Sequence, residues 1–291
     1  MNLLNYIKQS VRKSLLYPYL KTVLNLFSMS KVNLSQIAEL LINDFGIKYG
    51  DTIIVHTSYK HISECDYEPE DLIFLLKTIV GSKGNIIMPS FRRSKEFYNQ
   101  VPFNVKSTKG RSGLINEILR RSPDTVQSIH PWKSCVVWGK DAQELTKDHF
   151  KSERAFDENS PYYKAMLLHG KYVGIGVGIE FCSFLHTIED NNTLLFDEVY
   201  DLPITQKIVG LDGSVCERKY RHISKQTMTT QSVPNITKYL LEPYFQDTFI
   251  RNIPFSYADL SYLYTTLVKL AEEGVSIHSA SSSETKRDHI L

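Results

Sequence analysis

The sequence contains 291 residues, of which 42% are hydrophobic and 23% are charged. A chain of this length and composition buries about three quarters of its extended surface, which excludes a disordered chain, a collagen and a coiled coil. The 34 Lys and Arg residues nearly balance the 32 Asp and Glu residues, for a net charge of +2, so a nucleic-acid-binding protein with a strongly basic surface is also excluded.

The cysteines and the hydropathy pattern indicate a cytoplasmic protein. The four cysteines, at positions 65, 135, 182 and 216, form no C-x-x-C pair, which argues against a zinc knuckle and a disulfide framework. No stretch reaches the roughly 18 apolar residues that span a membrane, and the N-terminus lacks the apolar core and cleavage site of a signal peptide.

The N-terminal segment carries the one local charge bias. The first 38 residues contain five basic side chains and no acidic one, and their apolar residues recur at helical spacing. Residues 1–32 are therefore predicted to form a basic amphipathic segment. Such a segment either packs on the domain or makes weak contact with an anionic membrane surface through residues 1–30, and packing is the simpler interpretation.

Predicted helices and strands then alternate up to about residue 190. Asn33 or Ser35 caps the first helix and Gly46 stops it, and the short β-branched run at 52–55 is typical of a buried strand. Further strands are expected at 85–89, 135–138 and 171–177, and further helices from Pro69 to Gly81, at 112–121, at 141–149 and from Ser160 onward. This alternation predicts an α/β fold.

The pattern changes in the last hundred or so residues. Residues 199–208 are strand-like, and Asp212-Gly213 favours a tight turn, so a β-hairpin insertion is expected around residues 208–215.

The C-terminal region is predicted to close the domain with a helix. This helix is expected over 257–273 and is followed by a polar tail at 279–291 that we expect to be mobile. The chain has no solenoid repeat and no long linker, so residues 33–278 are predicted to form a single domain.

Glycines at 174, 176 and 178 invite comparison with a dinucleotide-binding loop. That motif needs a further glycine at Ile179, and no acidic residue stands at the ribose-binding distance. The glycines are better explained by a strand that another backbone or a ligand approaches closely.

The densest group of reactive side chains lies at residues 182–190. If this stretch is helical, Cys182, His186 and Glu189 share one face. In one mechanism His186 is a general base supported by Glu189. In another, His186 activates the Cys182 thiolate as a nucleophile, which forms a covalent intermediate. A surface histidine paired with a glutamate is the remaining interpretation, and a zinc site is disfavoured because no H-E-x-x-H motif is present.

Two more histidines fall at or beside the carboxyl ends of predicted strands. His56 is followed by Thr57 and Ser58, and His130 is followed by Ser134. Ligands of open α/β sheets gather at this edge, and hydroxyl donors suit an amide-rich or phosphate-bearing ligand. Each group taken alone is also ordinary turn chemistry.

Taken in order, these segments resemble the aminoglycoside 3-N-acetyltransferase family, which uses acetyl-CoA to acetylate an amino group on a sugar. The resemblance covers about residues 33–200. It rests on GDTIIVHTS at 50–58, GNIIMPSF at 84–91, GLINE at 113–117, SIHP at 128–131 with Ser134 and Gly139, ENSP at 158–161, and Ser183 with His186 and Glu189.

The resemblance implies an α/β/α sandwich with a central mixed sheet, acetyl-CoA as cosubstrate and no metal. It implies a catalytic pair at His186 and Glu189. Either Ser183 or a backbone N–H is expected to donate to the thioester oxygen as negative charge develops there. Contacts to acetyl-CoA and the active-site cleft are implied at His56, Thr57, Ser58, His130 and Ser134.

Two positions depart from the family pattern. The family commonly has threonine at the position of Ser183, which keeps the hydroxyl, and glycine at the position of Asp157. Because Asp157 alters the mouth of the acceptor pocket, Asp157 and Glu158 are expected to contact the amine of a small-molecule acceptor.

The charge balance bears on the identity of that acceptor. A polycationic aminoglycoside should be drawn by an acidic protein, whereas this chain carries a net charge of +2. An amino sugar, either alone or carried on an anionic nucleotide, is therefore the preferred acceptor. Modification of an aminoglycoside antibiotic, which confers resistance, is the alternative, and a Cys182 thiol acyltransferase is the second alternative. The acyl chain length, the regiochemistry and the oligomeric state stay open.

Overall fold

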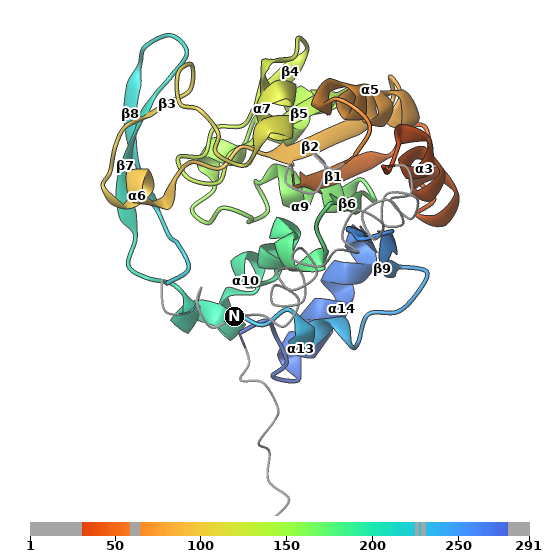
Figure 1. The fold of residues 1–291 in the computed structure, drawn as a ribbon. Helices are drawn as coiled ribbons and strands as arrows, with labels where there is room; N and C mark the ends of the chain where they lie inside the picture. The colour runs from red at the N-terminus through yellow and green to blue at the C-terminus, as the bar shows by residue number, and fades with distance from the viewer. Residues whose placement is uncertain (1–30, 59–64, 225–226, 228–230, 279–291) are drawn as a thin grey trace, which may run out of the picture. The chain divides into compact units, whose positions relative to one another are not determined.

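A computed structural model describes residues 31–58, 65–224, 227 and 231–278 of the chain (Figure 1). The chain divides into two compact units, Met1–Val32 and Asn33–Leu291, and the fold below is that of the second unit. The predictions for the basic segment at 1–30 and for the tail at 279–291 lie outside the described residues.

The centre of the second unit is a seven-stranded sheet. In spatial order its strands are β4 (Thr125–Gln127), β5 (Cys135–Gly139), β2 (Asn85–Pro89), β1 (Thr52–Thr57), β6 (Lys171–Ile175), β10 (Ile253–Asp259) and β9 (Phe245–Ile250). Strand β1 pairs in parallel with β2 and β6, and all other neighbours in this sheet are antiparallel. The predicted mixed sheet is therefore confirmed.

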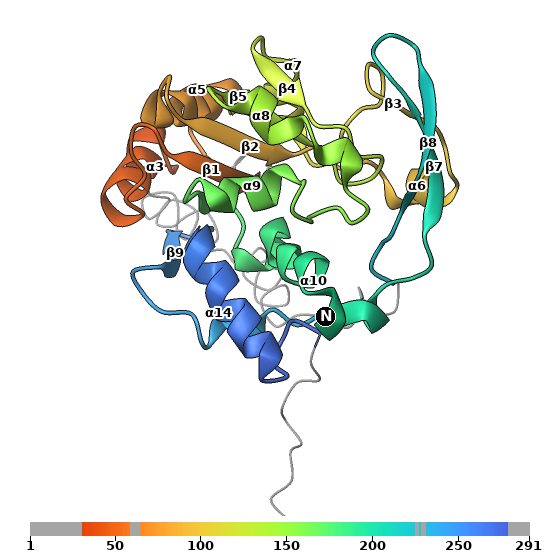
Figure 2. The same ribbon diagram turned by 180° about the vertical axis from the view of Figure 1, so that it is seen from behind.

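Helices cover both faces of this sheet (Figures 1 and 2). Strands β1 and β2 read as nearly continuous apolar runs because both of their faces are buried. One face carries α3 (Leu34–Glu39) with the π-helical turn Leu40–Asp44, α5 (Pro69–Val80) and α7 (Leu114–Arg121). The other face carries α8 (Ala142–Thr146), α9 (Pro161–Leu167), α10 (Thr187–Asn191) and α14 (Leu260–Glu272). The layers form the expected α/β/α sandwich.

Side-chain caps fix where several helices begin. Asn33 accepts a hydrogen bond from Gln36 N at 3.0 Å, and the Ser160 hydroxyl accepts one from Tyr163 N at 3.1 Å. These two helix starts follow directly from capping chemistry, whereas other predicted bounds need correction.

The final helix begins at Leu260, so the predicted start at residue 257 is wrong. Residues 253–259 instead form β10, which pairs with both β6 and β9, and Asp259 caps the helix by accepting from Tyr262 N at 2.8 Å. Neither β9 nor β10 is predicted from the sequence. In β10, Pro254 interrupts the apolar run, although a proline is tolerated where the sheet does not need its N–H.

Three further predicted elements are shorter in the structure. The helix expected at 112–121 starts at Leu114, and the one expected at 141–149 ends at Thr146 before a 3-10 turn at His149–Lys151. The strand expected at 199–208 is β7, Ile204–Val209. The remaining short elements are α6 (Ser94–Tyr98), α11 (Thr193–Phe196), α13 (Pro234–Thr237) and 3-10 turns at Ile179–Phe181, Ser183–His186 and Asp197–Val199.

A smaller three-stranded sheet stands beside the sandwich (Figure 1). It combines β3 (Phe103–Asn104) with the hairpin formed by β7 and β8 (Val215–Tyr220), whose turn includes Gly213 at φ +81°. Its core consists of Phe97, Phe103, Trp132, Ile208 and Tyr220. Since Trp132 comes from the loop before β5, this core ties the small sheet to the edge of the large one.

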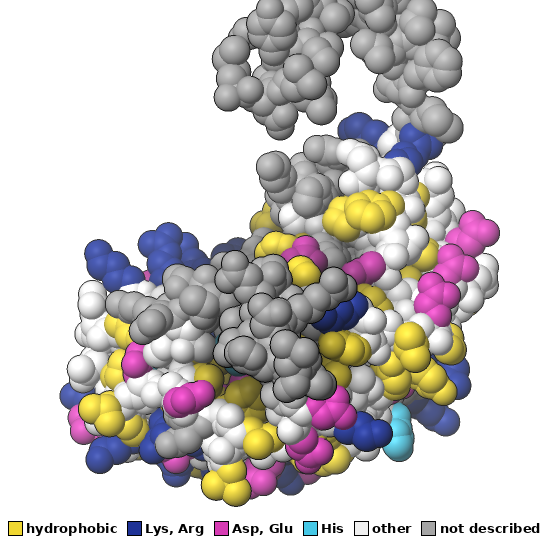
Figure 3. Space-filling model, turned by 90° about the horizontal axis from the view of Figure 1, so that it is seen from below, with side chains coloured by type: hydrophobic (Ala, Val, Ile, Leu, Met, Phe, Trp, Pro, Cys, Tyr) yellow, Lys and Arg dark blue, Asp and Glu magenta, His cyan; other side chains and the backbone are white. Residues whose placement is uncertain are grey.

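The surface agrees with the small net charge. On the uncovered part of the face drawn in Figure 3, basic side chains are interspersed with acidic ones. Within the described ranges, no helix is both long enough and apolar enough to span a membrane.

Candidate active site

The candidate site lies where three parallel strands end. Strands β1, β2 and β6 run in the same direction, so their carboxyl ends meet at one edge of the sheet, where open α/β sheets bind ligands. Strand β5 runs antiparallel to β2, and the loop that precedes it therefore reaches the same edge. This loop contributes Trp132 and Lys133, which line the two cavities described below.

The first cavity, here called the basic cavity, is an open hollow of about 430 Å³. It is lined by His56, Thr57, Pro89, Phe91, Arg92, Arg93, Ser94, Arg111, Ser112, Trp132, Lys133, Val177, Phe181 and Ser183. Four of these side chains are cationic and none is acidic, so the cavity suits an anionic ligand.

The arginines of the basic cavity differ in what they can offer a ligand. Arg92 is buried, and its guanidinium donates to Val101 O at 2.8 Å and to Gln206 Oε1 at 3.1 Å. Arg93 and Arg111 are exposed. Arg111 lies just before α7, whose first-turn N–H groups also attract negative charge. Arg93 and Arg111 are therefore the groups best placed to contact phosphate.

His56 and Ser183 meet at the inner wall of the basic cavity. The Nε2 atom of His56 lies 3.2 Å from the hydroxyl of Ser183. Burial, with a smaller contribution from the Lys133 charge, lowers the pKa of His56 to about 3. His56 is therefore neutral at physiological pH and can hold the Ser183 hydroxyl by a hydrogen bond without acting as a cation.

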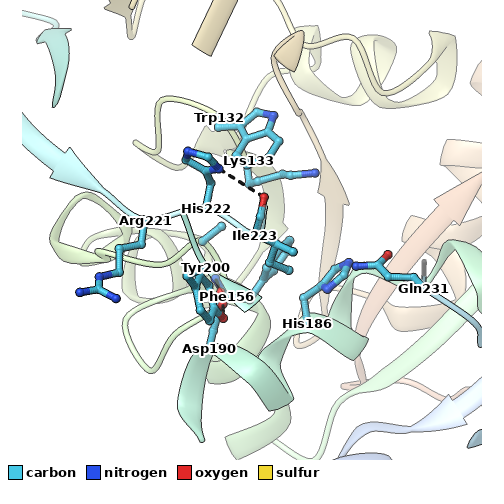
Figure 4. A pocket seen from close by; sticks show the side chains of 11 residues that line it. Trp132, Lys133, Phe156, His186, Asp190, Tyr200, Arg221, His222, Ile223 and Gln231 are labelled. Atoms are coloured by element: carbon cyan, nitrogen blue, oxygen red, sulfur yellow. Dashed lines mark hydrogen bonds between the residues drawn. The ribbon is translucent and has the colours of Figure 1, made fainter. Parts of the chain in front are cut away.

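The second cavity, here called the His186 cavity, is a small, partly open hollow of about 40 Å³ (Figure 4). It is lined by Trp132, Lys133, Ala155, Phe156, His186, Asp190, Tyr200, Arg221, His222, Ile223 and Gln231. The His186 ring projects from its helical turn into the cavity beside Gln231 (Figure 4). It also stacks on Phe156, with the ring centroids 5.6 Å apart.

The structure brings His186 and Glu189 together as their spacing predicts. His186 Nδ1 lies 3.4 Å from Glu189 Oε1, and Glu189 is only 1% exposed. Burial alone would raise the pKa of Glu189, but the neighbouring histidines His186 and His278 outweigh it and lower the pKa to about 2. The carboxylate is therefore charged over the whole physiological range and can fix the orientation of the His186 ring.

Asp190 is a cavity residue that the sequence analysis did not single out. Its carboxylate accepts hydrogen bonds from the Tyr200 hydroxyl and, at 2.6 Å, from Phe156 N. Burial raises the pKa of Asp190 to about 7, so its charge changes near neutral pH. The feature of the sequence that could have identified Asp190 as a site residue is its position directly after Glu189.

Lys133 was also missed, and it lines both cavities. Its Nζ atom lies 4.4 Å from the centroid of the Phe91 ring and 4.6 Å from that of Trp132. Burial lowers the pKa of Lys133 to about 8, against an opposing contribution from Asp190. Lys133 and Trp132 thus form the wall between the two cavities.

His130 and Ser134 support this wall and line neither cavity. The buried His130 ring accepts at Nδ1 from Lys133 N at 3.0 Å and from Trp132 N at 3.3 Å. The buried Ser134 hydroxyl donates to Ser90 O at 2.7 Å. In place of the ligand contacts expected from the sequence, both side chains make contacts that fix the loop.

Thr57 and Ser58, at the end of β1, are placed differently. The Thr57 hydroxyl lines the basic cavity and donates to Asn116 Oδ1 at 3.3 Å. Ser58 N donates to Ile175 O at 3.1 Å, and Ser58 does not line that cavity.

Asp157 and Glu158 do not line the His186 cavity. The Asp157 carboxylate accepts from the Ser152 hydroxyl at 2.7 Å and from Asn159 N at 3.0 Å, so it stabilises its own loop. Glu158 is exposed. The acid that does line this cavity is Asp190.

The expectation that Cys182, His186 and Glu189 share one helical face is wrong. Residues 179–186 form two separate 3-10 turns, and Cys182 lies between them. Cys182 is 3% exposed, lines neither cavity, and its burial raises the pKa of the thiol. A thiol in this state is a poor nucleophile.

In the part of the chain that the structure describes, no group of three or more His, Cys, Asp or Glu side chains is arranged to hold a metal ion.

Comparisons of the sequence with known proteins agree on one family. Residues 54–272 match the family model described as aminoglycoside 3-N-acetyltransferase. A relative from Serratia marcescens, named aminoglycoside N(3)-acetyltransferase III, is 27% identical over 164 residues. The match covers 51% of this chain and 61% of that relative, which is less than two thirds of the relative's length.

Solved structures share the fold. One described as AAC-IIIb in binary complex with CoASH has a TM-score of 0.66 at 19% identity, covering 83% of this chain and 97% of its own. Another, described as sisomicin-bound AAC-VIa, has a TM-score of 0.67 at 18% identity, covering 85% of this chain and 100% of its own.

Proposed function

The chain belongs to the aminoglycoside 3-N-acetyltransferase family, and on that premise we propose that it transfers an acetyl group from acetyl-CoA to an amino group of an aminoglycoside. The observation that carries this proposal is the pairing of His186 with the buried Glu189 carboxylate at the wall of a cavity that adjoins a second, basic one. The His186 cavity would take the amino group of the acceptor, and the basic cavity would take the acetyl-CoA.

The basic cavity has the charge that CoA requires. Arg93 and Arg111 are exposed at its rim beside the start of α7, and guanidinium groups with a helix N-terminus are well suited to phosphate. The related AAC-IIIb structure is a binary complex with CoASH. We assign the phosphates of CoA to Arg93 and Arg111 and its thioester end to the side of the cavity that contains Ser183.

The reaction is the aminolysis of a thioester by direct transfer. With Nδ1–H directed at Glu189, the neutral His186 ring keeps its lone pair on Nε2 and can take a proton from the acceptor amine. The amine nitrogen then forms a bond to the thioester carbonyl carbon, and the carbon–sulfur bond breaks. CoA leaves as a thiolate, which is then protonated.

Two side chains at the boundary of the cavities can assist the step. The Ser183 hydroxyl, held by His56 Nε2 at 3.2 Å, is assigned to donate to the thioester oxygen as negative charge develops there. The Lys133 ammonium between the cavities adds positive potential at the same place. A covalent route through Cys182 is not proposed, because that thiol is buried.

A hollow next to the His186 cavity supports the aminoglycoside as acceptor. It shares Tyr200 and His222 with that cavity and is also lined by Glu198 and Asp201. Carboxylates there, together with Asp190, can pair with the several ammonium groups of such an acceptor. The related AAC-VIa structure has sisomicin bound.

A nucleotide-linked amino sugar is the second candidate acceptor. It is favoured by the overall charge of +2 and by Lys133 and Arg221, two cations that line the His186 cavity. An anionic nucleotide would pair with them.

An assay of CoA release, with aminoglycosides and nucleotide-linked amino sugars offered in parallel, tests the proposal. Mass spectrometry and NMR of the product identify the acetylated nitrogen. We expect turnover on kanamycin-like and sisomicin-like acceptors. Turnover on nucleotide-linked sugars alone would establish the second candidate, and no CoA release with either class would refute acyl transfer to both.

A further inference from the structure

Glu189 contacts two histidines through the same oxygen atom. His186 Nδ1 lies 3.4 Å from Oε1, and His278 Nε2 lies 2.5 Å from it. The two histidines are 92 residues apart in the sequence (278 less 186). The shorter of the two contacts is the one to His278.

The backbone around His278 holds its ring in place. Gly274, at φ +79°, turns the chain after α14, and Ser232 N donates to Ile277 O at 2.7 Å. The His278 backbone N–H donates to the Ser276 hydroxyl at 3.1 Å. The side chain of His278 is 8% exposed, and its ring centroid lies 6.2 Å from that of Phe196. The ring therefore meets Glu189 from a fixed position.

The buried Glu189 carboxylate depends on these contacts. Removing a charge from water is costly unless hydrogen bonds and opposite charges compensate it. His186, at 3.4 Å, is a weak partner, and Asp190 and Tyr200, the other ionisable groups beside the carboxylate, contribute no positive charge. Lys133 and Arg221 are the cations that line the His186 cavity. The groups that lower the pKa of Glu189 are the two histidines, His186 and His278.

We propose that His278 is a positioning residue of the acyl transfer: its Nε2–H donates to Glu189 and holds the carboxylate, charged, against His186. This inference rests on the proposed role of His186 as the general base. His278 lines neither the His186 cavity nor the basic cavity and acts through Glu189. The chain therefore uses a His–Glu–His arrangement in which the second ring is supplied by the segment after the last helix.

Two variants separate hydrogen bonding from packing. In His278→Phe the ring volume stays and the donor is lost, whereas His278→Gln places an amide donor at a similar reach. We expect His278→Phe to lower kcat about tenfold, the size of effect that is typical when a residue that holds a functional side chain in place is replaced. The KM for acetyl-CoA should be unchanged. His278→Gln should recover most of the loss.

The pH profile supplies a readout that packing would not move. In His278→Phe only one histidine opposes the effect of burial, so the pKa of Glu189 rises from about 2. Because a neutral Glu189 no longer holds the His186 ring, the loss of kcat that Glu189 protonation adds to the acidic limb begins at a higher pH. His278→Gln should keep the limb near its original place. Equal kcat and an unmoved limb in both variants would overturn the proposal.

Proton NMR of protein labelled with ¹⁵N-histidine tests the coupling without any acceptor. A ring N–H that donates to a carboxylate resonates downfield, as expected of a charge-assisted hydrogen bond. His278→Phe should remove one such signal and shift the other, which belongs to His186, and Glu189→Gln should shift both. An unchanged His186 signal in His278→Phe refutes the inference even if acetylation is established. A shifted signal in a protein that turns over no acceptor supports the arrangement while the proposed function fails.

Discussion

The basic cavity and the His186 cavity, which meet at Trp132 and Lys133, are built from different kinds of secondary structure. The basic cavity is lined largely by residues at the ends of the parallel strands β1, β2 and β6 and the loops that follow them. The His186 cavity takes its walls from a 3-10 turn, from the segment at 221–223 that follows β8, and from single residues such as Tyr200 and Gln231. The strand ends of the sheet and the loops beside them therefore supply the anion-binding side, and a 3-10 turn supplies the base.

Because of this difference, we expect the two cavities to bind different substrates. All family members that use the same cosubstrate can share a site fixed by strand ends, whereas segments outside the sheet can vary with the acceptor. Substitutions of residues that line the basic cavity should then change the KM for acetyl-CoA. Substitutions of residues that line the His186 cavity should change kcat or the KM for the acceptor.

The largest effect should come from His186→Ala. Loss of a positioned base lowers kcat about 10²- to 10⁴-fold, and the KM for acetyl-CoA should hold because His186 does not line the basic cavity. The release of CoA thiol measures both constants. His169→Asn, at an exposed histidine with φ +52° that asparagine tolerates, is the matched control. A kcat close to that of the control would remove His186 from the reaction.

The next largest effect should come from Arg111→Ala, which changes the basic cavity. A charge-assisted hydrogen bond contributes about 1.5–3 kcal/mol, so the KM for acetyl-CoA should rise about tenfold or more while the KM for the acceptor stays. Arg121→Ala, at the far end of α7 where Arg121 pairs with Glu117 at 2.9 Å, should change neither constant. Equal effects of the two arginines would argue against phosphate binding at Arg111.

Asp190→Asn tests the acceptor side through pH. Because burial raises the pKa of Asp190 to about 7, the carboxylate is neutral below that pH and charged above it. An ion pair of about 1 kcal/mol corresponds to roughly a fivefold change in affinity. The acceptor KM of Asp190→Asn should therefore exceed that of the unmodified protein at pH 8 and approach it at pH 6. Steady-state kinetics at both pH values measure this, and a constant ratio would contradict it.

The smallest kinetic effect is expected from Cys182→Ala. The thiol lines neither cavity, so kcat should stay within about twofold, while loss of a buried atom costs about 1 kcal/mol of unfolding free energy. Thermal denaturation measures the stability, and mass spectrometry of the protein incubated with acetyl-CoA checks for an acyl adduct. An adduct at Cys182 would restore the covalent mechanism.

Local patterns in the sequence were enough to predict much of the sandwich. Short apolar runs predicted strands at 52–55 and 85–89, which the structure has at 52–57 and 85–89. Capping residues predicted the helix starts at Asn33 and Ser160, because these signals depend on neighbours within a few residues. The spacing of His186 and Glu189 is of the same kind, and the two side chains do meet.

Only the tertiary structure decided which side chains face the cavities. Lys133 reaches them because β5 pairs antiparallel with β2, while His130 and Ser134 from the same loop turn inward. The strand pairing of β10 and the fold of the segment after α14 likewise brought His278 to Glu189. Such contacts join residues far apart in the chain, and their geometry depends on the packing of the whole sheet, which no local pattern records.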